Sequence, residues 1–268
     1  MPEGDAGRAR LAEVLGCFSL ATDLGVGQPL QHTLRACLLA MELASALGLD
    51  AGQQRELFDV ALLQRIGCTA DAFELSTWFD DELAAHARTY TLDFGRPREV
   101  LIDVVRHAGA GRPAVRRLRT VATALTTGRA AVPSFFAASC EVAQRLTARL
   151  GFSPPVQCAV GQVFERWDGR GWPAGARGEA IALSIRIARL AAAAEVFDRL
   201  GGPESAVAVV RRRSATIYDP AIAGAFCRHA PHLLAILSVE SALDAVLSRE
   251  PGAPRYLPPA DLEAALGT

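Results

Sequence analysis

The sequence predicts an all-helical bundle, from its composition and from the spacing of its apolar residues. Hydrophobic residues make up 50% of the 268 residues, and many of them are alanine. Alanine is the strongest helix former, and its small side chain lets neighbouring helices approach closely. Apolar residues recur at helical spacing along most of the chain, and no run shows the alternation of a half-buried strand. We therefore expect helices throughout and no β-strands.

The charge balance excludes several classes of partner. The chain has 28 basic and 29 acidic residues, so its net charge of -1 creates no overall field that attracts nucleic acid or anionic lipid. Every basic residue is arginine, which we attribute to coding bias. No uninterrupted apolar run reaches the roughly 18 residues of a membrane span. We expect a cytoplasmic protein that binds no membrane and makes no direct contact with nucleic acid through this segment.

The cysteines predict neither a disulfide framework nor a zinc site. The six cysteines are widely spaced, and no pair has the CxxC spacing. We expect reduced, buried thiols, as is usual in cytosolic proteins.

Caps and periodicity place the first three helices. The first runs from about Arg8 to Leu24. The second begins with Pro29 in its first turn and ends at Gly48, because glycine is favoured just beyond a helix. One face of that helix carries the apolar residues Leu30, Leu34, Cys37, Leu38 and Met41. Asp50 caps a third helix with Gln53 at the capping-box position, and this helix ends at Gly67.

The rest of the sequence predicts further helices and a linker. Two amphipathic segments lie between Ala70 and Gly111, and a segment at 113–125 follows. Further helices are expected over Ser134 to Leu150, Pro155 to Arg166, Gly178 to Leu200, Pro203 to Arg213, and Pro220 to Ser238. From Ser248 the chain is rich in proline, before a short stretch that begins a helix. We divide it into an N-terminal helix and lead-in (1–29), a helical domain (30–247), and a linker with the start of a helix (248–268).

Arginines cluster near the start of the 113–125 segment, at positions 112, 116, 117 and 119. They are a candidate anion site, but a solvated helix face is the favoured interpretation.

The most informative stretch is ERWDGRGWPAGARGEAI, at residues 165–181. Its glycines, its proline and its few apolar residues predict an exposed, tightly turning loop between two helices. Such a loop either closes over a ligand or presents a binding surface.

This loop resembles the signature HHERxDGxGYPxGLxGxxI of the HD-GYP family. The matching residues are Glu165, Arg166, Asp168, Gly169, Gly171, Pro173, Gly175, Gly178 and Ile181, and Trp172 stands in place of the tyrosine. HTLRACLLAMELASALGLD resembles the first core helix of the family, with His32 at its first histidine. ARLAAAAEVFDRL and IYDPAIAGAF resemble two later elements, so the similarity runs from about residue 30 to 230. The resemblance implies an HD-domain-like helical bundle.

The family's catalytic metals polarise a phosphodiester and generate a hydroxide nucleophile. Where the family has LHDIGK this chain has LQRIGC, so the histidine and aspartate ligands fall on Gln64 and Arg65. The paired histidines before the loop fall on Val163 and Phe164, and a later aspartate falls on Glu195. The resemblance thus leaves competent ligands only at His32 and Glu195, because the other replacements ligate poorly or not at all. We expect no metal, or iron or manganese if the site is active.

Arg65 carries a fixed positive charge at a former ligand position. It can replace part of the lost metal charge, pair with Glu195 or accept a phosphate group, and we favour the salt bridge. His86, His107, His229 and His232 have no partners at metal-site spacing, so we interpret them as surface or core histidines.

GCTADA at residues 67–72 and the tail at 249–266 are similar to the N-terminal module of bacterial tandem-HD LuxR-type regulators. This similarity implies a role in transcription regulation and a partner: a second HD-GYP domain or another signalling domain, in the same or another chain.

Three hypotheses follow. The favoured one is a catalytically degenerate regulatory module that binds a partner or a nucleotide. The second is an active metal-dependent phosphodiesterase acting on cyclic di-GMP or another nucleotide. The third is a structural domain that forms a homodimer, which a large exposed apolar face without a pocket would favour.

Overall fold

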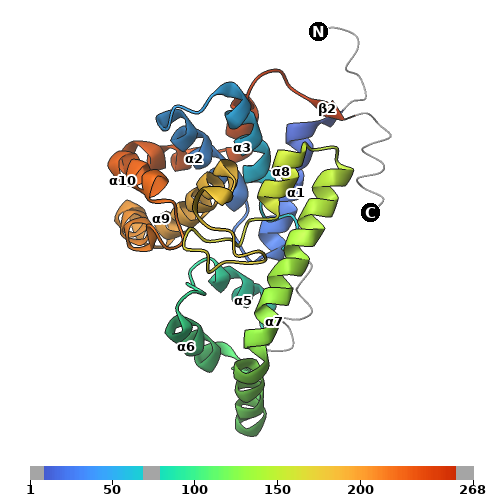
Figure 1. Ribbon diagram of the computed structural model, residues 1–268, viewed down its shortest axis with the longest axis vertical. Helices are drawn as coiled ribbons and strands as arrows, with labels where there is room; N and C mark the ends of the chain where they lie inside the picture. The colour runs from blue at the N-terminus through green and yellow to red at the C-terminus, as the bar shows by residue number, and fades with distance from the viewer. Residues whose placement is uncertain (1–8, 69–78, 258–268) are drawn as a thin grey trace.

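The computed structural model describes residues 9–68 and 79–257, and most of them are helical (Figure 1). The α-helices are α1 (Leu11–Gly25), α2 (His32–Ala46), α3 (Ala51–Leu63), α5 (Glu82–Thr89), α6 (Pro97–His107), α7 (Ala114–Arg149), α8 (Pro154–Val160), α9 (Leu183–Arg213), α10 (Pro220–Ala235) and α11 (Ala242–Ser248). Two 3-10 turns, Gly178–Ala180 and Ile236–Ser238, complete the helical elements of this part of the chain. The all-helical prediction is confirmed.

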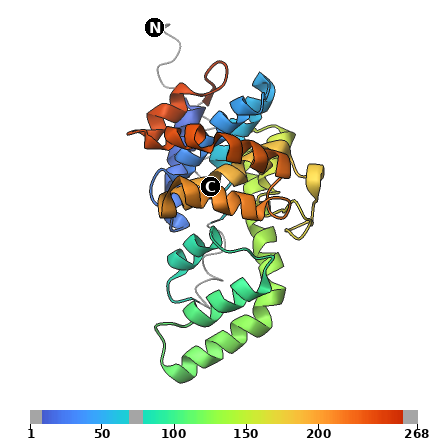
Figure 2. The same cartoon turned by 90° about the vertical axis from the view of Figure 1, so that its left-hand side faces the viewer.

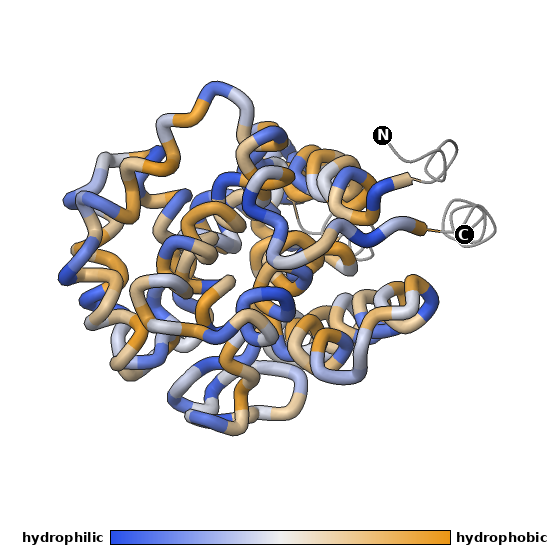
Figure 3. Tube along the Cα trace, turned by 90° about the horizontal axis from the view of Figure 1, so that it is seen from above, coloured by the Kyte–Doolittle hydropathy of each residue, from blue (hydrophilic) through white to orange (hydrophobic). Residues whose placement is uncertain are grey.

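The core of the protein is built around α2 and α9, which pack against each other more extensively than any other described pair. Leu34, Leu38 and Leu43 of α2 are completely buried, and so are Ala191 and Ala194 of α9. The short alanine side chains allow close approach of the helix backbones, while the leucines fill the space between them. Helices α3 and α10 pack on this pair, and α1 and α11 lie against α2. The helices carry both apolar and polar residues along their length (Figure 3), as expected of helices with one buried face.

Local sequence explains where several helices begin and end. Asp50 and Gln53 form the expected capping box at the start of α3. Gly48 has a φ of 72° just after α2, a conformation that glycine adopts without strain. The break expected between Leu200 and Pro203 is a kink at Gly201 and Gly202 inside α9.

Other boundaries were wrong. Gln31 has a φ of 73°, so α2 begins at His32 rather than Pro29, and Leu30 lies outside the helix and is exposed. The segment expected to run from Pro155 to Arg166 already ends at Val160. The segments expected at 113–125 and 134–150 are one helix, α7, with Pro133 inside it.

An arm extends beyond the bundle. Its elements are α5, α6 and the N-terminal half of α7, whose C-terminal half runs alongside the bundle next to α8 (Figures 1 and 2). At 1.5 Å per residue, the 36 residues of α7 span about 54 Å. This length lets one helix connect the bundle and the arm.

The expectation of no strands was also wrong. Ala9–Arg10 (β1) and Tyr256–Leu257 (β2) form a two-stranded antiparallel ladder. Strands of two residues are too short to show alternation in a sequence. Their pairing fixes the proline-rich segment after α11 beside the start of α1, and Leu257 is buried there. The domain boundary at 248 stays a prediction, and the expected helix start beyond 257 lies outside the described residues.

Burial of the cysteines was only half correctly predicted. Cys37, Cys68 and Cys140 are buried, whereas Cys17 and Cys158 are exposed. All are free thiols.

Within the described ranges, no single helix is long and apolar enough to cross a membrane. Two neighbouring helical segments reach the required length and hydropathy only when they are taken together. They are Pro220–Ser238 and Ala242–Ser248, and the chain bends by 114° between them.

We predict that Leu38→Ala lowers the free energy of unfolding by about 2–5 kcal/mol, because it opens a cavity in the α2–α9 core. Leu30→Ala is the matched control: Leu30 is 56% exposed, against 0% for Leu38. The control should change stability by less than about 0.5 kcal/mol. Urea unfolding of the three proteins measures both effects, and equal losses would contradict this description of the core.

Candidate functional site

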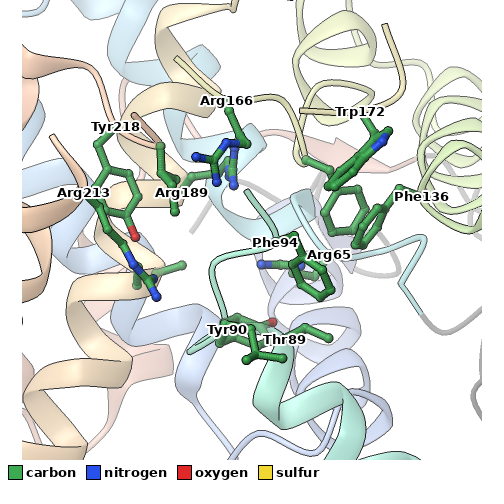
Figure 4. Close-up of a pocket in the computed structure, with 15 residues that line it drawn as sticks. Arg65, Thr89, Tyr90, Phe94, Phe136, Arg166, Trp172, Arg189, Arg213 and Tyr218 are labelled. Atoms are coloured by element: carbon green, nitrogen blue, oxygen red, sulfur yellow. The ribbon is translucent and has the colours of Figure 1, made fainter. Parts of the chain in front are cut away.

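A pocket lies where α9, α7, the segment after α5 and the loop before α9 meet (Figure 4). It is narrow: the space in it that a water molecule can reach is about 70 Å³, and it opens to solvent. Its lining combines arginines with aromatic residues, and none of the described lining residues is acidic. The polar and aromatic lining residues are Arg65, Thr89, Tyr90, Phe94, Phe136, Phe164, Arg166, Trp172, Arg189, Arg213 and Tyr218.

Arg65 lies in this pocket, directly after the C-terminal end of α3. Its guanidinium carbon is 4.3 Å from the centroid of the Tyr90 ring and 5.4 Å from that of Phe164. Its Nη1 atom is 3.9 Å from Sγ of Cys68. The contact with Cys68 is a hydrogen bond. The contacts with the two rings are cation–π interactions, in which a guanidinium lies over an aromatic face.

The predicted salt bridge between Arg65 and Glu195 is wrong. Glu195 is instead hydrogen-bonded to Nδ1 of His32. Its other oxygen lies 3.4 Å from Nε of Arg199, one turn further along α9. The Tyr90 ring packs edge-on against His32, with 5.1 Å between the centroids. Tyr90 thus contacts both His32 and Arg65.

Asp23 is the second carboxyl group near His32. It accepts hydrogen bonds from the backbone N–H and the hydroxyl of Thr33 at the start of α2. Burial nevertheless raises the pKa of Asp23, against the opposing effects of Thr33 and His32. Through its hydrogen bonds to Thr33, Asp23 holds the turn before α2 in place.

The replaced ligand positions do not recreate a metal site. Gln64 is buried, and its amide donates to the carbonyl of Ala61 at 3.0 Å. Val163 packs in the main core, and the Phe164 ring lies 4.2 Å from that of Phe136. Across residues 9–68 and 79–257, no three His, Cys, Asp or Glu side chains are grouped so that they could hold a metal ion. The described donor set does not fit the catalytic metals implied by the family resemblance.

Two charge pairs hold the loop that follows Phe164. Arg166 makes two hydrogen bonds to Asp168, at 3.0 Å from Nε and 2.9 Å from Nη2, in the fork geometry typical of arginine. Its Nη1 atom pairs with Asp93, which lies between α5 and α6. The buried Arg166 side chain thus ties the loop of the bundle to the arm.

The charge pairs also set the acidity of Asp168. Burial opposes ionisation, but hydrogen bonds from Arg166 and from the backbone N–H of Arg170 outweigh it. The pKa of Asp168 is therefore lowered.

The remaining loop residues shape the turn. Glu165 is buried and accepts a hydrogen bond from the Ala174 backbone N–H at 2.7 Å. A Cβ atom at Gly171 would lie 2.5 Å from the Glu165 backbone, so glycine is required there. Gly169, Gly175 and Gly178 have positive φ angles. Of the predicted loop residues, only Arg166 and Trp172 line the pocket; Pro173 and the glycines do not.

An aromatic wall forms the side of the pocket next to α7. The rings of Phe136 and Trp172 are stacked with 5.2 Å between centroids, and Phe94 packs edge-on against Phe136 at 5.5 Å. Phe94 belongs to the arm, Phe136 to α7 and Trp172 to the loop, so three distant segments build this wall (Figure 4).

Sequence reasoning missed several lining residues. Tyr90, Phe94 and Phe136 have no local signal, because their meeting depends on the arm. Arg189 did have one: it is a charged residue within the otherwise apolar stretch IARLAAAA. A charge in that setting indicates a polar cavity or a partner.

The other candidate positions lie elsewhere. His86 is buried in the arm, and His229 and His232 are exposed on α10. Arg112 pairs with Asp80, Arg117 caps carbonyls at the end of α6, and Arg116 and Arg119 are exposed. This arrangement agrees with a solvated helix face.

Comparisons with known proteins agree with the architecture. Residues 121–222 match the HD domain family. A 3′3′-cGAMP-specific phosphodiesterase 3 of Vibrio cholerae serotype O1 is 27% identical over 210 residues, which cover 78% of this chain and 46% of that protein. A crystal structure of a cyclic GMP-AMP specific phosphodiesterase from V. cholerae has a TM-score of 0.72 and 25% identity, covering 97% of this chain and 60% of that one. The chain has an HD-domain fold.

The comparisons also set the extent of the likeness. The chain spans about half the length of the curated relative it matches. The similarity to tandem-HD LuxR-type regulators depends on segments that lie partly outside the described residues, and it stays a prediction.

We predict that Asp168→Asn lowers the free energy of unfolding by about 1–2 kcal/mol near pH 7, because it weakens two charge-assisted hydrogen bonds. The pKa of Asp168 is lowered in the folded state. Its stabilisation is therefore present above the unfolded pKa of about 3.9 and is lost as the pH falls through the folded pKa.

Urea unfolding of wild type and variant at several pH values measures this effect. The difference between the two proteins should narrow below about pH 4. Glu141→Gln, which removes an exposed ion pair with Arg145, is the control and should show little difference at any pH. A gap for Asp168→Asn that does not depend on pH would contradict the ionic role.

Proposed function

We propose that this HD-fold domain is a regulatory binding module that does not hydrolyse its ligand. One observation carries the proposal: the positions that resemble metal ligands hold a cation, an amide and two apolar side chains. Arg65 is protonated at any physiological pH, so it repels metal ions and attracts anions. The two remaining candidates, His32 and Glu195, bond to each other.

The ligand of this module is a nucleotide or a partner domain. The V. cholerae relative is named for 3′3′-cGAMP, a cyclic dinucleotide. Arginines line the pocket of this chain, and arginine is the side chain best suited to pair with phosphate, which supports the proposal. The relative is about twice as long as the matched region, which supports a second signalling domain as partner, in the same or another chain. We also propose cyclic di-GMP as a nucleotide ligand and transcription regulation as the role of the module.

The second candidate is a metal-dependent phosphodiesterase that uses iron or manganese. It is favoured by the likeness to cyclic GMP-AMP phosphodiesterases in both sequence and structure. Its metals would need ligands that the described residues do not group together. For this reason we rank it second.

A purely structural dimerisation domain ranks third. Exposed apolar side chains do gather on α6 and α7, including Leu101, Ile102, Val115 and Leu118. The molecule also has a pocket with convergent polar groups, which favours ligand binding.

We predict that the purified, untagged protein contains less than one equivalent of iron or manganese and does not hydrolyse 3′3′-cGAMP or cyclic di-GMP, even with added metal. Plasma mass spectrometry and chromatographic assays measure the two quantities. The V. cholerae phosphodiesterase is the positive control for the assay. Two or more equivalents of metal together with turnover would overturn the proposal in favour of the second candidate.

A rebuilt variant makes the same test sharper. Gln64→His, Arg65→Asp, Val163→His and Phe164→His together restore the ligand types that the resemblance implies. If Arg65 and Phe164 are what excludes metal, this variant binds more metal than wild type. Circular dichroism establishes that the variant is folded. A folded variant with no more metal than wild type would contradict this reason for the exclusion.

A further inference from the structure

The arm carries an apolar surface that no described part of the chain covers. Six of the eleven large apolar side chains exposed in residues 9–68 and 79–257 belong to α6 and the N-terminal half of α7. Val115 and Leu118 are the most exposed of all, at 67% and 70%. Clustered apolar side chains on a surface indicate an interaction site. We call the following six residues the arm face: Leu101, Ile102, Val105, Val115, Leu118 and Leu125.

Helix α6 is amphipathic but contributes no buried residue to the protein. Five of its eleven residues are valine, leucine or isoleucine, and none of the eleven is buried. A short helix gains most of its stability from packing its apolar face against another element. The apolar side of α6 is therefore only partly used within the described chain.

Helices α6 and α7 form an antiparallel hairpin at the end of the arm (Figure 2). Arg117, near the start of α7, donates to the carbonyls of Val105 and Arg106 near the end of α6. Further from the turn, Val104 and Val121 pack into the same small core of the arm. These two valines therefore mark the sides of α6 and α7 that face the interior of the arm.

The two halves of the arm face lie on the same side of this hairpin. Leu101 comes three residues before Val104, and Leu118 comes three residues before Val121. At 3.6 residues per turn, each leucine lies about 60° round its helix from the inward-facing valine, in the same sense. Side chains turned in the same sense on two antiparallel helices point to the same side of the pair. One continuous apolar surface results.

The spacing on α7 suits a partner helix. Val115, Leu118, Ala122 and Leu125 are three, four and three residues apart, and all four are exposed. This spacing is that of the a and d positions of a heptad, which form the contact stripe between two paired helices. The stripe is narrower than the apolar face of a helix that lies on a membrane, and the arm face includes no aromatic residue.

Exposed arginines border the arm face. Arg98 and Arg106 each lie one helical turn from Ile102, and Arg119 lies one turn from Val115. None of these three arginines forms an ion pair with a residue in 9–68 or 79–257. Their charges are therefore available to a partner.

The two carboxylates of α6 do not neutralise this border. Glu99 pairs with Arg96, and Asp103 pairs with Arg88 and His107. A second copy of the arm face would therefore bring arginines against arginines, which is unfavourable. A partner with acidic residues beside its apolar stripe matches the arm face in both respects.

We propose that the arm face docks an acidic amphipathic helix of a partner protein. The helix packs its apolar stripe against Leu101, Val115 and Leu118, and its carboxylates pair with the bordering arginines. No residue of the arm face lines the pocket described above. The inference therefore goes beyond the proposed function and does not depend on what the pocket binds or whether the protein hydrolyses it.

Two synthetic peptides of about four heptads test the proposal on the full chain. Both have leucine at positions a and d; one has glutamate at positions e and g, and the other has lysine there. These like charges also keep each peptide from pairing with itself. Fluorescence anisotropy of the labelled peptides measures binding. We expect the acidic peptide to bind at least about tenfold more tightly than the basic one, and added salt to weaken its binding.

Three variants assign the contact to the arm face. Leu118→Gln should weaken binding of the acidic peptide at least about tenfold. Arg98→Glu combined with Arg119→Glu should reverse the preference, so that the basic peptide binds more tightly. Leu24→Gln alters a leucine that is 58% exposed on α1, outside the arm, and is the matched control that should bind as wild type does. Circular dichroism shows that each variant is folded.

Several outcomes would overturn the inference. They are binding of neither peptide, equal binding of both, and unchanged binding by folded Leu118→Gln. Analytical ultracentrifugation and vesicles containing phosphatidylglycerol test the other occupants. A dimer that Leu118→Gln dissociates would assign the arm face to a second copy, and vesicle binding that the same variant abolishes would assign it to lipid. Metal content and turnover, which test the proposed function, leave this inference unaffected.

Discussion

The structure depends on a buried polar contact between its two central helices. His32 begins α2 and Glu195 lies in α9, and their hydrogen bond sits between two helices whose buried residues are mostly apolar. Because an unpaired polar group in such an interface is costly, the pair restricts how α2 and α9 can align. The same two residues are the ones that the sequence marks as remaining metal ligands. Their mutual bond links α2 and α9 at the positions where the resemblance implies metal ligands.

A second polar contact decides the shape of the pocket. Arg166 joins the loop of the bundle to Asp93 of the arm, and this contact brings Phe94 to face Trp172. Ligand-binding pockets often lie where two structural units meet, as the bundle and the arm do here. The two contacts together explain how the bundle retains an HD-domain architecture while its cavity acquires arginine and aromatic walls.

Replacing metal ions by arginines changes what such a cavity can do. A metal polarises a phosphodiester and supplies an activated hydroxide, whereas a guanidinium offers charge and hydrogen bonds without a nucleophile. The proposed function assigns this arginine-lined cavity affinity for phosphate without the means to cleave it. Regulatory domains can use such affinity, because a ligand that binds one conformation better shifts the population toward it.

The sequence by itself determined the helical class, the capping box of α3, the kink of α9 and the loop that carries Arg166 and Trp172. These features depend on residues close in the chain, where propensity, caps and glycine positions act. Only the tertiary structure decided that Glu195 pairs with His32 instead of Arg65, that α7 is one helix, and that Phe94, Phe136 and Arg189 share a cavity. Contacts between residues far apart in the chain depend on how whole helices pack, and local pattern carries no information about which of several possible partners is nearest.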